Sequence, residues 1–184
     1  GCGETSYIKL LTQLYQDKIV IANATGCSSI YGGSAPSTPF SIPWANSLFE
    51  DNAEFGYGIH LSYKLKRKQI EDIMKSEIAS DSILKTIYQK WLDNQKNYEI
   101  TCEVYNELKN LDINGELKPL LKYIPTRTVW EIGGDGWAYD IGFSGIDHIL
   151  SSNENIKILV LDTEVYSNTG GQMSKSSHVG QVAE

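Results

Sequence analysis

Residues 128–171 read TVWEIGGDGWAYDIGFSGIDHILSSNENIKILVLDTEVYSNTGG. A short apolar run, 129–132, stops at the glycine-rich turn 133–136 and is followed by an amphipathic segment, 137–150, and an apolar run, 156–161. This order of strand, glycine turn, helix and strand predicts a βαβ unit whose two strands are parallel neighbours. The turn after the first strand and the loop after the second should therefore emerge at the carboxyl edge of the sheet, where open α/β sheets bind ligands.

The two loops at this edge carry oxygen ligands. Asp135 lies between Gly134 and Gly136, so the backbone can approach a ligand closely, and Thr163 follows Gly136 after a spacer of 26 residues. Carboxylate and hydroxyl oxygens suit Mg²⁺, which completes its octahedron with substrate phosphates. The amides that open the helix at Trp137 would help to hold a diphosphate. The pattern of Gly-Asp-Gly, spacer and hydroxyl predicts a thiamine diphosphate site.

Two other interpretations of the Gly-Asp-Gly motif are available. On its own the tripeptide is also typical of a plain tight turn. A dinucleotide site fits poorly, because Tyr139 stands where the third glycine of that fingerprint would be. The strand before the motif, the helix after it and the polar residue at the right distance favour the cofactor.

Length and composition agree with one α/β domain. The chain has 184 residues, of which 41% are apolar and 21% charged, and this composition argues against disorder. A net charge of -7 disfavours nucleic acid as a partner, and no apolar run approaches the length of a membrane span. The chain starts inside a glycine turn and stops without a closing element, so we expect a piece of a larger protein, incomplete at both ends.

The first part of the chain supplies another strand end. Residues 4–16 predict a helix, with Ile8, Leu11, Leu14 and Tyr15 on its apolar side, and residues 19–22 a buried strand that ends in a hydroxyl-rich loop. A proline- and glycine-rich loop, 31–43, follows. Residues 44–123 are expected to be mostly helical, with Asn46 as the first cap and the basic run 64–68 on a solvated face.

The three cysteines are of two kinds. Cys102 lies in a helical stretch and is expected to be a small structural residue. Cys2 and Cys27 each stand beside glycine in a loop, where a thiolate can reach a metal cluster. A disulfide between these two is the alternative, although nothing in the chain indicates a secretory context.

Several of these stretches together resemble the thiamine-binding domain of the pyruvate:ferredoxin oxidoreductase family, including its pyruvate:NADP⁺ variant. The resemblance rests on residues 133–142, residues 162–172 with their EVYSNTGGQ run, and the segments 2–5, 22–32 and 46–51. It implies a parallel-sheet thiamine diphosphate-binding fold over residues 1–184, with a helical insertion at about 44–123 between the first strand and the Gly-Asp-Gly unit. Between Pro39 and Trp44 the family carries a longer loop, so this loop is either shortened here or lacks residues.

The resemblance also implies the site residues. Asp135, Thr163 and the Val165 carbonyl would hold Mg²⁺, and Asn168 would lie against the reactive ring and the substrate as the catalytic residue. The remaining cofactor contacts implied are Gly134, Gly136, Trp137, Ser167, Thr169, Glu4 and Cys27. A solvated loop carboxylate is an equal interpretation of Glu4. Cys2 and Cys27 would be two of the four thiolates that a [4Fe-4S] cluster needs.

The function implied is oxidative decarboxylation of pyruvate to acetyl-coenzyme A, in anaerobic metabolism, with electrons passed to iron–sulfur clusters. Implied partners are the remaining domains of the parent enzyme, a second copy in a homodimer, and ferredoxin, flavodoxin or a fused reductase as electron acceptor. The implied location is the cytoplasm or a hydrogenosome-like organelle. A non-oxidative thiamine diphosphate decarboxylase or synthase, and a non-catalytic α/β module, are the alternatives.

Overall fold

The computed structural model describes residues 2–32, 42–78, 82–111 and 113–183. The chain forms two compact units. The sheet unit comprises Gly1–His60 and Thr128–Glu184, and the helical unit comprises Leu61–Arg127. Each unit has its own core. The part of the chain around Pro39, where the expected loop is short, lies outside the described residues.

The sheet unit is built on four parallel strands in the order β2-β1-β3-β4. Their bounds are Ile19–Ala24 for β1, Trp44–Ser47 for β2, Thr128–Gly134 for β3 and Ile156–Leu161 for β4. Strands β3 and β4 pair in parallel from Val129 opposite Ile156 to Gly134 opposite Leu161. The predicted α/β class and the βαβ unit are therefore confirmed, and the carboxyl ends of β1, β3 and β4 meet at one edge.

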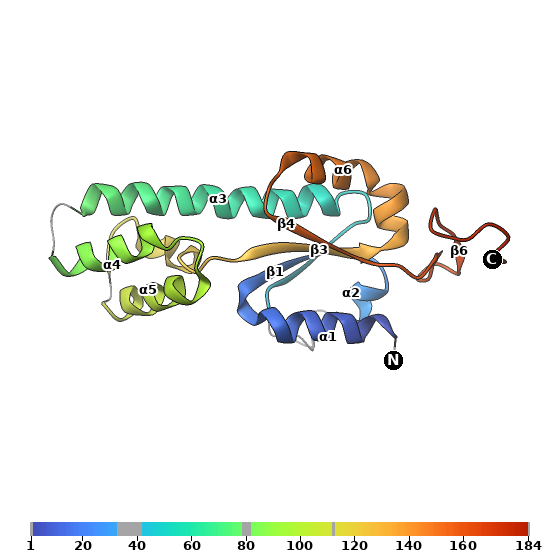
Figure 1. The fold of residues 1–184 in the computed structure, drawn as a ribbon, viewed down its shortest axis with the longest axis horizontal. Coiled ribbons are helices and arrows are strands. Elements are labelled where there is room, and N and C mark those ends of the chain that lie inside the picture. The colour runs from blue at the N-terminus through green and yellow to red at the C-terminus, as the bar shows by residue number, and fades with distance from the viewer. Residues whose placement is uncertain (1, 33–41, 79–81, 112, 184) are drawn as a thin grey trace. The chain divides into compact units, whose positions relative to one another are not determined.

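Helices cover both faces of this sheet. Figure 1 shows α1 (Glu4–Tyr15) and α2 (Cys27–Tyr31) on one face and α6 (Phe143–Ser152) on the other. On the α1 face, Ile8 and Leu11 pack into the core with strand residues, as the helical spacing predicted. Leu14, expected on the same buried side, lies in the last turn of the helix and is 66% exposed.

The structure contains one strand, β2, that the sequence pattern does not predict. The expectation of helix from residue 44, capped by Asn46, is wrong, because Trp44–Ser47 forms the edge strand β2 beside β1. The Asn46 side-chain oxygen accepts a hydrogen bond from Asn23 at 2.9 Å instead of capping a helix. Four residues carry no periodicity that separates strand from helix, so pairing with β1 decides their conformation. Helix α3 (Asn52–Glu77) begins later, and its first side chain is buried and bonded to Ser47 and Ala22.

The predicted helix 137–150 is also divided. Gly136–Ile141 is a π-helix, and its wider turn is closed by a hydrogen bond from the Gly142 N–H to the Trp137 carbonyl at 2.8 Å. The Trp137 ring is fully buried. A side-chain carbon added at Gly133 would lie 2.4 Å from that ring, and one added at Gly142 would lie 2.5 Å from it. Packing of the ring therefore requires glycine at both positions. Such π turns are frequent at functional sites.

The helical unit contains the C-terminal part of α3, with α4 (Ser82–Asp93), α5 (Tyr98–Asn110) and a 3₁₀ helix at Lys118–Tyr123. Trp91 and Tyr88 are at the centre of its core. The basic run 64–68 is not simply a solvated face. Lys68 is exposed beside Glu71 and Asp72, but the Arg67 guanidinium donates to three backbone carbonyls and lies 4.9 Å from the Trp91 ring.

Two short elements complete the chain: a 3₁₀ helix at Gln16–Lys18 and a hairpin of β5 (Val165–Tyr166) and β6 (Gln172–Met173). Across the described ranges, none of the helices is both long enough and apolar enough to cross a membrane.

Candidate functional site

A pocket opens at the carboxyl edge of the sheet, where β1, β3 and β4 end. Its cavity volume is about 40 Å³. Nine of the residues predicted for the site contribute to its wall: Glu4, Cys27, Gly134, Asp135, Gly136, Val165, Ser167, Asn168 and Thr169. Residues that lie more than 130 positions apart in the sequence thus meet at the edge predicted from the strand order.

Asp135 is the buried polar centre of this edge, with only 2% of its surface exposed. Its Oδ1 accepts hydrogen bonds from the backbone N–H and the hydroxyl of Thr163, both at 3.3 Å. The Thr163 hydroxyl oxygen also lies 3.1 Å from the Val165 carbonyl oxygen. Thr163 therefore contacts both of the other residues predicted to hold Mg²⁺, although Thr163 itself is not part of the pocket wall.

The chemistry of these donors fits a hard divalent cation. A carboxylate, a hydroxyl and a backbone carbonyl are all oxygen ligands of the kind that Mg²⁺ takes together with phosphate oxygens. In contrast, the described residues contain no group of three or more histidine, cysteine, aspartate or glutamate side chains that could hold a metal ion. A Mg²⁺ ion held here would therefore need ligands from a bound phosphate or water.

The two glycines on either side of Asp135 have different surroundings. A side-chain carbon built on Gly134 would meet nothing closer than the Leu161 carbonyl oxygen at 3.9 Å, so the backbone is open to a ligand there. One built on Gly136 would lie 2.4 Å from the Tyr166 ring. That ring is in turn held by a hydrogen bond from its hydroxyl to Asp140 at 2.9 Å. Burial and then this carboxylate raise the pKa of Tyr166 to about 12, so it remains a hydrogen-bond donor.

The tip of the β5–β6 hairpin places polar side chains against a thiol. Cys27 begins helix α2, and its Sγ lies 3.4 Å from the Ser167 Oγ and 3.9 Å from the Asn168 Oδ1. The residue predicted to contact the reactive ring and one predicted cluster ligand are thus neighbours. This arrangement was not evident from the sequence, where the two residues are 141 positions apart.

Glu4 belongs to the same wall, and Cys2 precedes it by two residues. The Tyr31 hydroxyl donates to the Glu4 carboxylate at 3.1 Å. Burial, then the charge of Glu4 and its hydrogen bond, raise the pKa of Tyr31, and Cys2 and Cys27 add to this effect. Both thiols therefore lie within electrostatic reach of a single phenol. All three cysteines of the chain are free, so the disulfide considered above is not formed.

Some predicted residues lie elsewhere, and some site residues were missed. Cys2 is exposed outside the pocket wall, and the Trp137 ring belongs to the core, so Trp137 could serve a ligand only through its backbone. Ser174 and Ser176 both donate to the Asp135 Oδ2, and neither was predicted. The only signal for them was a serine-rich run after the hairpin, which is equally typical of a loop.

Comparison with known proteins identifies the same stretch. The family described as thiamine pyrophosphate enzyme, C-terminal TPP binding domain, matches residues 119–183. The whole chain is 45% identical over 205 positions to a protein named pyruvate:ferredoxin oxidoreductase in Moorella thermoacetica, covering 18% of it. It is 50% identical over 202 positions to pyruvate-flavodoxin oxidoreductase of Klebsiella pneumoniae, covering 17%. It is 46% identical to the mitochondrial pyruvate dehydrogenase [NADP(+)] of Euglena gracilis, covering 11%.

In each of these comparisons 100% of the present chain is aligned. The chain spans less than a fifth of the length of these relatives. The alignments are longer than the 184 residues present, so each relative carries residues that have no counterpart here.

Proposed function

The chain belongs over its whole length to the pyruvate:ferredoxin oxidoreductase family, and we propose that it forms the thiamine diphosphate-binding part of an enzyme that oxidatively decarboxylates pyruvate. The observation that carries the proposal is that the Thr163 hydroxyl contacts both Asp135 and the Val165 carbonyl, where two neighbouring parallel strands end. Three oxygen ligands of this kind, next to an open glycine backbone, suit a Mg²⁺ diphosphate.

The cofactor would be held by its diphosphate end. Asp135, Thr163 and Val165 would supply oxygen ligands to Mg²⁺, and the open backbone at Gly134 would admit the phosphate oxygens. The first turn of the π-helix at Gly136 presents N–H groups that favour an anion, although a single turn contributes less than a full helix. Ser167 and Thr169, in the wall of the same pocket, are further candidates for hydrogen bonds to the cofactor.

Thiamine diphosphate, when bound, supplies a carbanion centre and an electron sink for the loss of CO₂ from a 2-oxo acid. The residues of this chain position the reactants around that centre. The amide of Asn168, in the pocket wall, is the group that would donate a hydrogen bond to the substrate oxygen as negative charge develops there. Glu4 has its carboxylate held by Tyr31 and is the candidate for contact with the pyrimidine edge.

Electron transfer would depend on the two cysteines at or near this wall, Cys2 and Cys27. Cys2 and Cys27 would each give a thiolate to a [4Fe-4S] cluster, with the remaining two thiolates from elsewhere in the parent enzyme. The 3.9 Å separation between the Cys27 Sγ and the Asn168 Oδ1 supports this, because it would bring a cluster ligand beside the reacting centre. Coenzyme A as acyl acceptor, and ferredoxin, flavodoxin or a fused reductase as electron acceptor, belong to the same proposal.

The decisive experiment replaces Asp135 with alanine in the full-length enzyme. The variant should lose a charge-assisted ligand, which costs about 2–5 kcal/mol, and the Mg²⁺-dependent affinity for thiamine diphosphate should fall at least about tenfold. Calorimetric titration of thiamine diphosphate with and without Mg²⁺ measures this directly. Asp147→Ala, which removes an exposed carboxylate from helix α6, is the matched control and should leave the affinity unchanged.

Two results would contradict parts of the proposal. Equal cofactor affinity in the Asp135→Ala and Asp147→Ala variants would mean that the Gly-Asp-Gly turn is only a turn. Cofactor binding without the visible absorption of an iron–sulfur cluster in the purified full-length protein would instead favour a non-oxidative thiamine diphosphate enzyme.

A further inference from the structure

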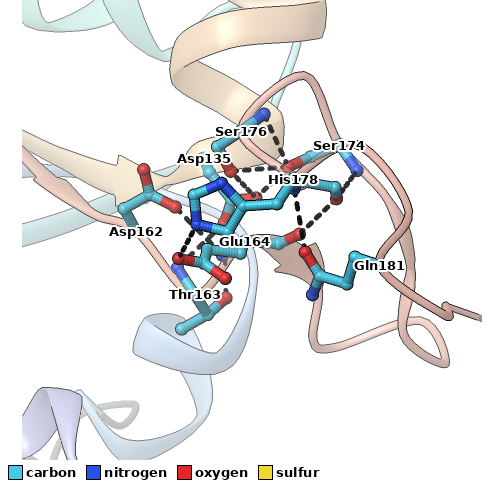
Figure 2. A network of polar contacts seen from close by, with 9 residues as sticks. Asp135, Asp162, Thr163, Glu164, Ser174, Ser176, His178 and Gln181 are labelled. Carbon is cyan, nitrogen blue, oxygen red and sulfur yellow. Dashed lines mark hydrogen bonds and ion pairs between the residues drawn. The ribbon is translucent and has the colours of Figure 1, made fainter.

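A serine turn, residues 174–177, lies against the proposed metal site from the segment that follows β6. Figure 2 shows Ser174 and Ser176 directed at Asp135, with Glu164 and His178 beside them. Ser174 Oγ donates to the Asp135 Oδ2, and Ser176 Oγ donates to the same oxygen at 3.1 Å. The two serines therefore contact one oxygen of Asp135, whereas Thr163 contacts the other.

The directions of the hydrogen bonds within the turn are set by its own backbone. The Ser176 N–H donates to the Ser174 Oγ at 3.3 Å, which leaves the single proton of that hydroxyl for Asp135. The Ser174 N–H donates to the Ser177 Oγ at 2.9 Å, which leaves the Ser177 proton for the Glu164 carbonyl. The Ser174 and Ser176 hydroxyl oxygens also lie 2.8 Å apart, so the Ser176 proton can go to Ser174 as well as to Asp135.

The two oxygens of Asp135 are consequently not equivalent. Both serine hydroxyls lie within hydrogen-bond distance of Oδ2, and the Ser176 proton is shared between that oxygen and the Ser174 Oγ, which lies 2.8 Å away. Oδ1 also accepts two hydrogen bonds, both from Thr163 at 3.3 Å, and a cation held by the Thr163 hydroxyl would take the place of one of them. Oδ1 is thus the oxygen available to a cation, and it is the one that faces the Thr163 hydroxyl.

The same turn supports the second strand end. Glu164 has a left-handed backbone, with φ of 64°, which a residue with a side chain rarely adopts. Its N–H donates to the Asp162 carboxylate at 2.9 Å, and its carbonyl accepts from Ser177. This conformation lies immediately before Val165, whose carbonyl lies 3.1 Å from the Thr163 hydroxyl.

We propose that the serine turn is a positioning element for the metal site: Ser174 and Ser176 occupy one oxygen of Asp135, so that the carboxylate binds the cation through the other oxygen alone. The inference rests on the proposed function, because it concerns the same Mg²⁺. A carboxylate that binds through one oxygen suits the octahedral geometry of Mg²⁺, whereas Ca²⁺ accepts carboxylates through both oxygens. The turn therefore also contributes to the selectivity of the site for Mg²⁺ over Ca²⁺.

The test uses the full-length enzyme with both serines changed, Ser174→Ala and Ser176→Ala. Mg²⁺ and Ca²⁺ are titrated separately by calorimetry at a fixed concentration of thiamine diphosphate. The affinity for Mg²⁺ should fall about 10- to 100-fold, as is typical when partners of metal ligands are removed. The affinity for Ca²⁺ should fall less, because the freed Oδ2 can join Oδ1 as a second ligand. The ratio of the two affinities should therefore shift toward Ca²⁺.

Controls separate positioning from general loss of structure. Ser176→Thr keeps the hydroxyl and should retain most of the affinity for Mg²⁺. Ser151→Ala removes a hydroxyl that donates only within helix α6, to the His148 carbonyl at 2.8 Å, and should change neither affinity. A general disturbance of the unit would lower both metal affinities together and would not be reversed by threonine.

Two results would overturn the inference. Unchanged Mg²⁺ affinity in the double serine variant, or equal losses of affinity for Mg²⁺ and Ca²⁺, would show that the serines do not determine which oxygen of Asp135 binds the cation. Asp135→Ala is titrated in parallel to keep the proposed function separate. If Asp135→Ala abolishes Mg²⁺ binding while the double serine variant binds normally, the metal site stands and only the role of the serine turn is refuted.

Discussion

Glu131 should make the stability of the sheet unit depend on pH. This residue is on strand β3, is fully buried, and has no hydrogen-bond partner for either carboxylate oxygen. Its carboxyl group lies against helix α3, where a side-chain carbon on Gly56 would be 2.3 Å from Oε1. Burial, and to a lesser degree the charge of Glu54, raise the pKa of Glu131 from 4.5 to about 8.

The direction of the effect follows from proton binding. Because the pKa is higher in the folded chain than in the unfolded chain, the folded chain binds more protons between pH 4.5 and about 8. The stability is therefore complete below the lower value and is lost as the pH rises to the upper value. Each pH unit in the middle of this window costs about 1.4 kcal/mol of stability, and less near the two pKa values. The loss from this one group between pH 5 and pH 8 is therefore about 3 kcal/mol.

Glu131→Gln removes this titration and keeps the shape of the side chain. Urea unfolding of the chain, followed by circular dichroism at pH 5 and pH 8, should show the advantage of the variant over the unchanged chain growing by about 3 kcal/mol. Glu50→Gln, which removes an exposed carboxylate from the same unit, controls for the loss of one charge. An advantage that is the same at both pH values would refute the reasoning, because it would mean that Glu131 is not held neutral by burial.

The remaining predictions concern the thiols, a glycine, an arginine and the chain as a whole. Cys27→Ser in the full-length enzyme should lower the iron content and keep thiamine diphosphate binding, whereas Cys102→Ser, in helix α5, should change neither. Gly136→Ala should lower cofactor affinity about tenfold or more, measured by calorimetry, because the added carbon would lie 2.4 Å from the Tyr166 ring. Arg67→Ala should lower the free energy of unfolding of the helical unit by about 3 kcal/mol, measured with urea, since three carbonyls lose their donor. The 184-residue chain, reconstituted with Mg²⁺, thiamine diphosphate, iron and sulfide, should not reduce a viologen dye with pyruvate, because its three cysteines cannot supply four thiolates.

The sequence alone determined the βαβ unit and the place of the ligand edge. These features depend on local patterns: an apolar strand that ends at glycines, an amphipathic segment, and a second apolar strand that ends at Thr163. Parallel pairing of consecutive strands then follows from chain connectivity, and it brought Asp135 and Thr163 together as expected.

The tertiary structure alone decided features that depend on contacts between distant residues. Strand β2 has four residues and forms because β1 offers an edge, and the break of the predicted helix at Gly142 accompanies the burial of the Trp137 ring. The serine turn lies about 40 positions from the carboxylate that it contacts, and no local pattern joins the two. In the sequence, Glu131 is an ordinary polar residue of a strand. Helix α3 packs against it at Gly56 and makes it a buried acid. Burial depends on what packs against a residue, so the local sequence does not reveal it.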